Sequence, residues 1–225
     1  MDNFLDKIFF RSRNFDYISQ NLIDLTIQTP ANRIFEALNT YSESSEVRYV
    51  GGCVRKVIKK QIVDDIDLAT NLKPSEVCDA LKKKEINFYE TGIDHGTITA
   101  IIDKYKYEIT SLRKDVSTDG RHAKVEFSSD WKEDAARRDF SINSIYSDKD
   151  GNLFDPYDGK KDLESGNINF IGDAENRIKE DYLRILRYIR FFLNYSIHKH
   201  NPEIIKIIKK NIMGVSKLSS ERLLD

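Results

Sequence analysis

Residues 49–70 of this 225-residue chain have the sequence YVGGCVRKVIKKQIVDDIDLAT, which carries the strongest structural signal in the protein. A short apolar run ends at Gly51-Gly52, a brief amphipathic segment follows, and apolar residues then alternate with acidic ones up to Thr70. This order predicts a strand, a glycine turn, one or two turns of helix and a second strand. Adjacent glycines let the backbone approach a ligand closely. If a helix begins directly after them, its free N–H groups and Arg55 can hold a phosphate.

Asp65 and Asp67 are the first candidates for catalysis. On a strand they share one face, with Ile66 and Leu68 on the other. Two close carboxylates repel each other unless a cation lies between them, and Mg²⁺ is bound by one or two carboxylates together with substrate phosphates. A lone Asp-x-Asp is more often a solvent-facing pair on an edge strand. The Gly-Gly-x-x-Arg pattern upstream favours the metal site instead.

The composition is that of a globular protein, with 40% hydrophobic and 32% charged residues. No window offers the about 18 uninterrupted apolar residues of a membrane span, so we expect no membrane partner. The N-terminus lacks the pattern of a secretory signal. Two cysteines form no disulfide framework, which indicates a reducing compartment, and we expect a cytoplasmic protein. Because the net charge is −1, a polyanionic partner must meet a local basic face.

The first half of the chain predicts a lead-in followed by alternating helices and strands. Residues 1–29 are polar with little periodicity, whereas helices are expected at 30–41 and after Ser75, and a short strand at 86–89. Two β runs, 97–102 and 105–113, predict a hairpin that carries Glu108. Glu108 is either a third carboxylate at the metal site or an exposed glutamate opposite a lysine. Residues 114–121 are the best candidate for a mobile loop, and 124–127 for a small strand.

The second half is rich in charged residues that have two interpretations. The dense charge at residues 137–139 is either a solvated helix face or a guanidinium aimed at a triphosphate. Residues 160–165 predict a helix, 168–171 a strand, 174–195 one long helix and 202–212 another. Within the long helix, a polar stripe contains Asp181, Arg184, Arg187 and Arg190. Asp181 and Arg184, one turn apart, would ordinarily form a helical salt bridge.

Taken in order, these segments resemble the class II tRNA nucleotidyltransferases, the CCA-adding enzymes that share a superfamily with bacterial poly(A) polymerases. The resemblance covers about residues 30–225. It is carried by Gly51-Gly52-x-x-Arg55, Asp65-x-Asp67, residues 92–97, residues 108–113, Arg137-Arg138-Asp139 with Asn143, and Glu180-Asp181-x-x-Arg184-x-x-Arg187.

The resemblance implies an α/β (α+β) fold with two parts after the lead-in at 1–29. Residues 30–165 would form the head, a nucleotidyltransferase domain with a mixed β-sheet flanked by helices. Residues 166–225 would form the neck, an all-helical region that recognises the nucleotide and is truncated at residue 225.

The resemblance also implies a function and a set of site residues. The function is template-independent addition of CCA to the 3′ end of tRNA from CTP and ATP, with Mg²⁺ held by Asp65 and Asp67. The implied catalytic residues are Asp65, Asp67 and Glu108. The implied nucleotide-binding residues are Gly51, Gly52, Arg55, Arg138, Asp139, Asn143, Asp181, Arg184, Arg187 and Arg190, with Asp181 and Arg184 reading the base.

Other functions stay open. A bacterial poly(A) polymerase usually has a basic segment where this chain has residues 90–96, and a CC-only enzyme tends to shorten the region that is intact here at 115–125. A-only addition, or a nucleotide- or RNA-binding fragment without turnover, is a further alternative. The family usually has Asp after Arg55, where this chain has Lys56. We expect Lys56 to alter a supporting hydrogen bond and to leave the metal site intact.

Overall fold

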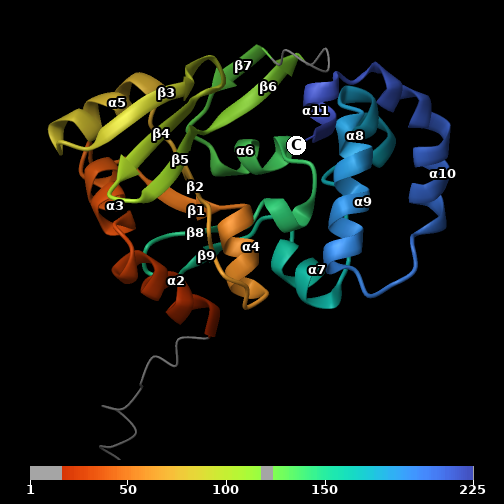
Figure 1. Ribbon diagram of the computed structural model, residues 1–225, viewed down its shortest axis with the longest axis horizontal. Coiled ribbons are helices and arrows are strands. Elements are labelled where there is room, and N and C mark those ends of the chain that lie inside the picture. Colours follow the sequence, from red (N-terminus) through yellow and green to blue (C-terminus); the bar gives the residue numbers. More distant parts are fainter. Residues whose placement is uncertain (1–16, 118–123, 225) are drawn as a thin grey trace, which may run out of the picture.

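A seven-stranded mixed sheet forms the centre of the protein, as the computed structural model shows for residues 17–117 and 124–224 (Figure 1). Its strand order is β3-β4-β5-β2-β1-β8-β9. Strand β2 runs parallel to β5, and the other described pairs are antiparallel. The strands are β1 (Val47–Val50), β2 (Ile66–Thr70), β3 (Asn87–Gly92), β4 (Thr97–Ile102), β5 (Tyr105–Ser111), β8 (Tyr146–Ser147) and β9 (Leu153–Phe154). The prediction of a mixed sheet flanked by helices is confirmed.

The motif at residues 49–70 folds as predicted. Strand β1 is followed by the helix α4 (Gly52–Ile58) and by β2, and β1 pairs antiparallel with β2. Tyr49 is fully buried, and its ring centroid lies 4.9 Å from that of Phe35. Leu68 and Ile109 are buried on neighbouring strands. The apolar face of this motif therefore fixes the glycine turn against the core of the sheet.

Further elements surround the sheet. Besides α4, the part of the chain at 30–165 contains the helices α3 (Ala31–Asn39), α5 (Pro74–Lys83), α6 (Trp131–Arg137) and α7 (Gly159–Ser165), with the 3-10 turns η1 (Ile93–His95) and η2 (Ser141–Asn143). A separate two-stranded sheet contains β6 (Arg113–Ser117) and β7 (Lys124–Phe127). Helices α3 and α5 pack against each other, and α4 contacts α7.

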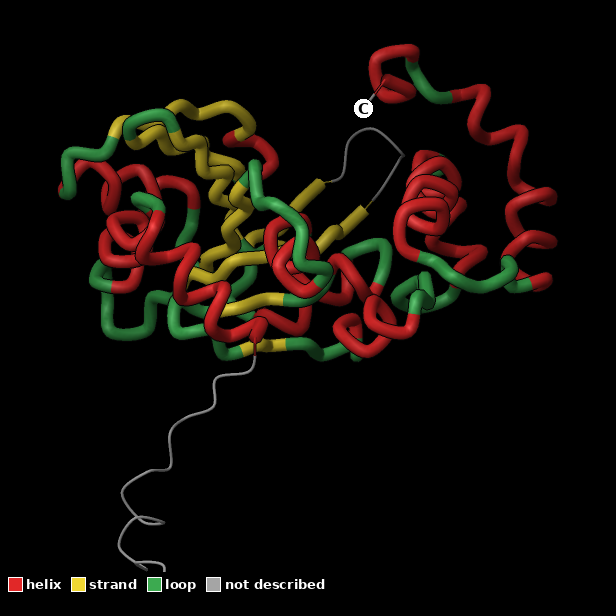
Figure 2. Tube along the Cα trace, turned by 60° about the horizontal axis from the view of Figure 1, so that its bottom comes forward, coloured by secondary structure: helices red, strands yellow, loops and turns green. Residues whose placement is uncertain are grey.

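The C-terminal part of the described chain is helical and stands beside the sheet (Figure 2). It contains α8 (Ala174–Glu180), α9 (Leu183–Tyr195), α10 (Pro202–Asn211), η3 (Ile212–Lys217) and α11 (Ser220–Leu224). Helix α10 packs against α8, and η3 against α9. The division into two domains at residue 165 stays a prediction, and head and neck are only names for residues 30–165 and 166–225.

Residues 17–28 lie in the polar lead-in, to which the sequence analysis assigned no helix or strand. They form the helix α2 (Tyr17–Gln28), which packs against α3 and α4. Ile18 and Leu22 are buried in the same core as the sheet, and the buried Thr26 hydroxyl lies 2.9 Å from the Tyr49 hydroxyl. Sequence periodicity missed α2 because few of its residues are buried and one of them is polar. Residues 1–16 lie outside the described part.

Three other predictions are corrected. The long helix predicted at 174–195 is two helices, because the backbone at Asp181 is extended (φ −153°, ψ 108°). The loop predicted at 114–121 begins as strand β6, and its residues 118–121 fall outside the described ranges. At 168–171 the structure has a single bridge, between Phe140 and Phe170. Within residues 17–117 and 124–224, no helix has the length and apolar character to cross a membrane.

Candidate nucleotide site between head and neck

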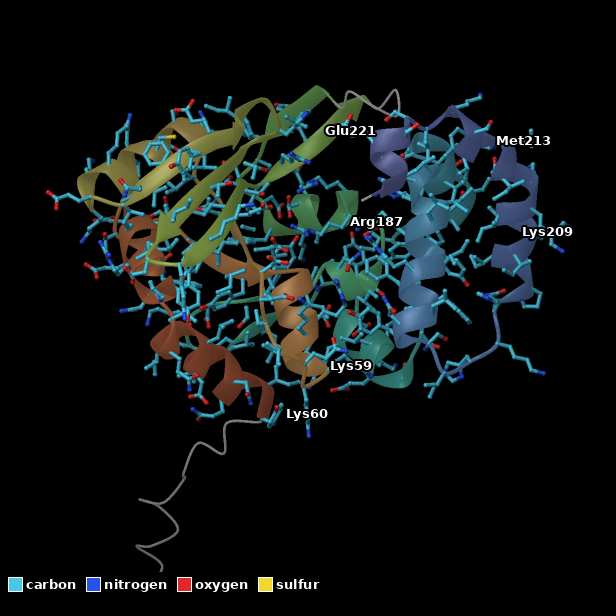
Figure 3. All side chains as sticks on the ribbon, in the orientation of Figure 1. Lys59, Lys60, Arg187, Lys209, Met213 and Glu221 are labelled. Carbon is cyan, nitrogen blue, oxygen red and sulfur yellow. The ribbon has the colours of Figure 1, made fainter. Side chains whose placement is uncertain are left out.

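A cavity of about 660 Å³ opens where the glycine turn and η2 of the head face α9 of the neck. Seven arginines and three aspartates line it, so its wall is strongly positive and suits a polyphosphate. Figure 3 shows Arg187 between α9 and the head. The lining is Gly51, Gly52, Arg55, Asp67, Arg113, Arg137, Arg138, Asp139, Asn143, Asp181, Leu183, Arg184, Arg187, Arg190, Phe191, Asn194 and Tyr195.

The glycine turn forms one wall of this cavity. Gly51 has a φ of 64°, a left-handed conformation that favours glycine, and a side chain added there would lie 3.8 Å from Nη1 of Arg138. A side chain at Gly52 would lie 3.4 Å from Oδ2 of Asp67. The two glycines therefore keep the space beside Arg138 and Asp67 open.

Arg138 is held in place from the head. Its Nη2 donates to Oδ2 of Asp134 at 3.0 Å, its Nε to the Tyr146 hydroxyl at 2.9 Å, and its Nη1 to the carbonyl oxygen of Asn143 at 3.3 Å. Burial alone would raise the pKa of the Asp134 carboxyl, but Arg138 and Arg137 outweigh it and lower that pKa to about 2. The same pairing raises the pKa of Arg138 despite its burial. Arg138 is thus a fixed, permanently charged guanidinium on the cavity wall.

Arg55 spans from the head to the neck. Its Nη1 donates to Oδ1 of Asn143 and its Nε to the Tyr195 hydroxyl at 3.2 Å. Its guanidinium lies 4.9 Å from the ring centroid of Phe191 and 5.4 Å from that of Tyr195. Cation–π contacts of this kind orient an arginine while its edge stays available for hydrogen bonds. Arg55 therefore depends on α9 for its position.

Asp139 and Asn143 lie on the cavity wall but mainly hold other residues. Oδ1 of Asp139 accepts from Nδ2 of Asn143 at 2.8 Å and from the Phe140 N–H at 2.9 Å. Oδ2 accepts from Nε of Arg187 at 2.5 Å. Burial would raise the pKa of Asp139, but Arg187 and these hydrogen bonds lower it. Asp139 is 8% exposed, so its carboxylate orients Arg187 and Asn143 from inside the protein.

The candidate metal ligands lie at the start of β2. Asp67 is on β2 and is paired in register with Glu108 on β5, while the exposed Asp65 directly precedes β2. Burial, and then the charge of Glu108, raise the pKa of the Asp67 carboxyl. Because β2 lies between β5 and β1, the edge-strand interpretation of Asp-x-Asp is wrong. Asp67 lines the cavity, whereas Asp65 and Glu108 are not part of its lining.

Two lysines neighbour these carboxylates. Nζ of Lys106 lies 2.9 Å from Oε1 of Glu108, on the same strand and not opposite it. Lys56 pairs with Asp64, whose Oδ1 also accepts the Asp65 N–H at 2.9 Å. Lys56 thus supports the turn that leads into Asp65. The described residues contain no group of three His, Cys, Asp or Glu side chains arranged to hold a metal ion by themselves.

Asp181 and Arg184 lie on the neck side of the cavity but do not pair with each other. Oδ1 of Asp181 accepts the Leu183 N–H at 3.1 Å, and Oδ2 accepts from Nη2 of Arg222 at 2.8 Å. Nη1 of Arg184 donates to Oε2 of Glu180 at 2.6 Å and to the carbonyl oxygen of Arg177 at 2.7 Å. The helical salt bridge that the spacing of Asp181 and Arg184 suggested is therefore absent from the described contacts. Each of the two side chains is held by other residues instead.

Several lining residues were missed from the sequence. Arg113 and Arg137 belong to the motifs at residues 108–113 and 137–139, but the sequence analysis assigned neither arginine to the site. Phe191 and Tyr195 are four residues apart on α9, on the face that contributes Arg184 and Arg187. Helical spacing from Arg184 would have found them. The partners Asp134 and Tyr146 had no local signal, because they meet Arg138 only in the folded chain.

The comparisons with known proteins agree with this geometry. The family model described as the poly A polymerase head domain matches residues 47–169. The human mitochondrial CCA tRNA nucleotidyltransferase 1 is 44% identical over 185 residues, which are 80% of this chain and 42% of that protein. A CCA-adding enzyme of Lactobacillus johnsonii is 39% identical over 184 residues, 80% of this chain and 44% of its own.

A solved structure also matches. The CCA-adding enzyme of Bacillus stearothermophilus in complex with CTP superimposes with a TM-score of 0.74 and 29% identity, over 85% of this chain and 45% of that one. The chain thus spans less than half the length of each of these three proteins. The head-domain match covers more than half of the described chain and contains the glycine turn, Asp67 and Arg138. This chain therefore belongs to the poly A polymerase head domain family.

Proposed function

We propose that this chain is the nucleotide-handling part of an enzyme that adds CCA to the 3′ end of tRNA from CTP and ATP. The observation that carries the proposal is a single cavity, which is lined by Asp67, by Asp181 and by seven arginines that include Arg184. It combines the parts that a transfer from a nucleoside triphosphate needs: an acidic group, a phosphate grip and a polar pair for a base.

The triphosphate is bound by the arginine-lined wall. Arg138 is held by the Asp134 carboxylate and the Asn143 carbonyl, and Arg55 is held by the Asn143 side chain and by Tyr195 on α9. Arginine suits this role because its planar guanidinium donates two parallel hydrogen bonds to phosphate oxygens. Gly51 and Gly52 leave room for the phosphates, and Arg187 and Arg190 extend the positive wall along α9.

A divalent cation, for which we propose Mg²⁺, fits the residues at the start of β2. The raised pKa of Asp67 reflects burial and the nearby charges of Glu108 and Asp65, and a cation would relieve that crowding. Asp65 and Asp67 would hold it, with Glu108 beside them. Two carboxylates suffice, because substrate phosphates and water complete the coordination of Mg²⁺. When bound, it would activate the attacking hydroxyl and neutralise the leaving pyrophosphate.

The reaction itself is an in-line displacement. The 3′-hydroxyl oxygen of the tRNA attacks the α-phosphorus, and a new P–O bond forms while the bond to the bridging oxygen breaks. Pyrophosphate leaves with the electron pair of that bond. The chain's own residues hold the triphosphate rigidly, which is the larger part of catalysis in phosphoryl and nucleotidyl transfer.

Base selection follows from the chemistry of Asp181 and Arg184. A carboxylate only accepts hydrogen bonds and a guanidinium only donates them. Cytosine and adenine each present an exocyclic amine beside an acceptor ring nitrogen, whereas uracil and guanine present a carbonyl beside a ring N–H. Nε and Nη2 of Arg184 donate to no residue in the described ranges, so they remain available for a ring nitrogen. The pair therefore favours C and A without a template.

The competing functions differ in their products. A poly(A) polymerase would extend RNA with A alone, and CC-only or A-only enzymes would stop early. A binding fragment would hold nucleotide without transfer. We therefore propose an assay with Mg²⁺, a tRNA lacking its 3′ tail, and CTP and ATP offered singly and together. Addition of C, C and A followed by a stop is expected, and a long A ladder would overturn the proposal in favour of the polymerase.

Asp65→Ala tests the metal site. Asp65 is exposed, so the variant should fold normally. We expect transfer to fall by more than the about 10–100-fold that is typical for losing a residue that only supports a metal ligand, because Asp65 would hold the metal itself. Asp150→Ala, which removes a carboxylate that is 64% exposed, is the matched control. Single-turnover transfer gives the rates. Wild-type turnover in Asp65→Ala would refute the role of this carboxylate.

We also propose a reducing compartment, the cytoplasm, for the protein. Cys53 and Cys78 are both free and buried, and burial raises the pKa of each thiol, so neither is poised for oxidation. Cell fractionation tests the compartment, and enrichment in an organelle would replace the cytoplasm in the proposal.

A further inference from the structure

The base-reading residue Arg184 is not held by the cavity alone. Its Nη1 donates to Oε2 of Glu180 at 2.6 Å, and the same carboxylate oxygen accepts from Nη1 of Arg177 at 2.6 Å. Arg184 also donates to the backbone carbonyl of Arg177. The side chains of Arg177 and Arg184 are 13% and 11% exposed, whereas that of Glu180 is 35% exposed, so the guanidinium groups are mostly covered and the carboxylate is partly open to water. One carboxylate therefore joins two mostly covered guanidinium groups.

Arg177 continues this chain of contacts into the head. Its Nη2 donates to the carbonyl oxygen of Arg137, and to that of Arg138 at 2.8 Å. These carbonyls stand at the C-terminal end of α6, where backbone oxygens lack helical partners and a cation is favoured. The guanidinium of Arg177 thus caps α6, although Arg177 itself belongs to α8 of the neck.

The head end of this path is also the phosphate end of the cavity. Arg138 supplies one of the accepting carbonyls, and its own guanidinium lines the cavity beside Gly51. Arg184, at the other end, lines the same cavity from α9. A displacement of α8 relative to α6 would change the distance between the two guanidinium groups that we assign to base and phosphate.

We propose that Arg177 and Glu180 are positioning residues that set Arg184 at a fixed distance from Arg138, so that base recognition and triphosphate alignment are coupled. The proposal rests on the proposed function of the cavity. It adds that selectivity for the base depends on Arg177 and Glu180, which are outside the lining of the cavity. Without Glu180, the guanidinium groups of Arg177 and Arg184 would lose the carboxylate that they share, and their like charges would repel each other. Without the guanidinium of Arg177, α8 would lose its attachment to the end of α6.

The test compares Arg177→Met and Glu180→Gln with Lys179→Met. Lys179 is on the same helix, is 51% exposed and pairs with Glu175, outside the cavity. Dissociation constants for CTP, ATP and UTP are measured by equilibrium dialysis on the 225-residue chain. In the first two variants we expect CTP and ATP to bind about tenfold more weakly while UTP changes little, so that discrimination is lost. Lys179→Met should behave as wild type.

The outcomes separate the positioning role from the function. Folded Arg177→Met and Glu180→Gln variants with wild-type CTP-to-UTP ratios would overturn the positioning role while leaving the proposed function intact. If Arg177→Met does not fold, Glu180→Gln, which keeps size and shape, decides alone. A wild-type chain without preference for CTP over UTP would instead refute the proposed base reading.

A spectroscopic measurement tests the contact itself without nucleotide. The ¹⁵Nη signals of Arg184, assigned with Arg184→Lys, should show restricted rotation about the guanidinium bond in the wild type. Glu180→Gln should release that rotation and Lys179→Met should not. Free rotation of Arg184 in the wild type would contradict the proposal whatever the binding data show.

Discussion

Asp134 holds Arg137 and Arg138 at the cavity although it is not itself part of the lining. It is 1% exposed and accepts hydrogen bonds from Arg137, Arg138 and Tyr146. Asp134→Asn leaves two guanidinium groups without a buried counter-charge, so we expect a loss of about 3–5 kcal/mol in the free energy of unfolding. Asp150→Asn, on the surface, should stay within about 0.5 kcal/mol. Urea denaturation checks both, and equal stabilities would contradict the buried pairing.

The same residue gives a pH dependence. The folded pKa of Asp134 is about 2, below its ordinary value of 3.8, so its stabilising contribution is fully present above about pH 4 and is lost as the pH falls toward 2. Wild type should therefore lose stability more steeply than Asp134→Asn between pH 4 and pH 2. Parallel curves for the two proteins in urea would argue against this assignment.

Arg184→Ala tests base reading at the residue scale. The variant keeps the arginines of the phosphate wall but loses the donor to the ring nitrogen, so we expect CTP to bind about tenfold more weakly and the preference over UTP to disappear. Affinity for inorganic triphosphate should be unchanged. Titration of the three ligands checks this, and a retained preference for C and A would remove Arg184 from base recognition.

Individual residues were predictable where the signal was local. Gly51, Gly52 and Asp67 follow from a glycine pair and from strand alternation within one short stretch, and the structure brings all three to one cavity. The contacts of Arg184 were not predictable from spacing. Both Glu180 and Asp181 lie within a helical turn of it in the sequence, and only the break between α8 and α9 decides which carboxylate it meets.

Among the elements, the sequence analysis missed helix α2 and treated α8 and α9 as one helix. Each difference has a physical reason. Helix α2 buries only Ile18, Leu22 and Thr26, so its periodicity is weak. The break at Asp181 has no Gly or Pro to announce it. Instead, the Asp181 side chain accepts the Leu183 N–H and starts the next helix, a capping signal that a continuous polar stripe hid.

Leu22→Ala tests the contribution of α2 to stability. Leu22 is fully buried where α2 packs on the sheet domain, so its truncation should lower the free energy of unfolding by about 2–5 kcal/mol. Ile27→Ala, on the same helix with 74% exposure, is the control and should change little. Thermal and urea unfolding measure the difference. If both variants matched wild type, α2 would be a dispensable lead-in after all.

At the scale of the whole molecule, the charge is distributed unevenly. The chain has a formal net charge of −1, yet seven arginines converge on one cavity. The dissociation constant for CTP should therefore rise about tenfold between about 0.05 and about 0.5 M KCl, because salt screens the triphosphate from these arginines. Cytidine, which lacks phosphates, should respond little. Equal salt dependence of the two ligands would mean that the arginine wall does not bind phosphate.

The pairing of β1 with β8 has a consequence for how the chain folds during synthesis. Val50 of β1 pairs with Tyr146 of β8. During synthesis, β1 therefore cannot form this pairing until roughly a hundred further residues have been made. Until then, the edge of β1 that will meet β8 is open, and closing the intervening loop carries an entropic cost that grows only slowly with its length. The glycine turn and Asp67 can form early, but the wall with Arg138 and Tyr146 is completed only when β8 joins. The cavity of the nascent protein is thus completed late, after most of the sheet has emerged.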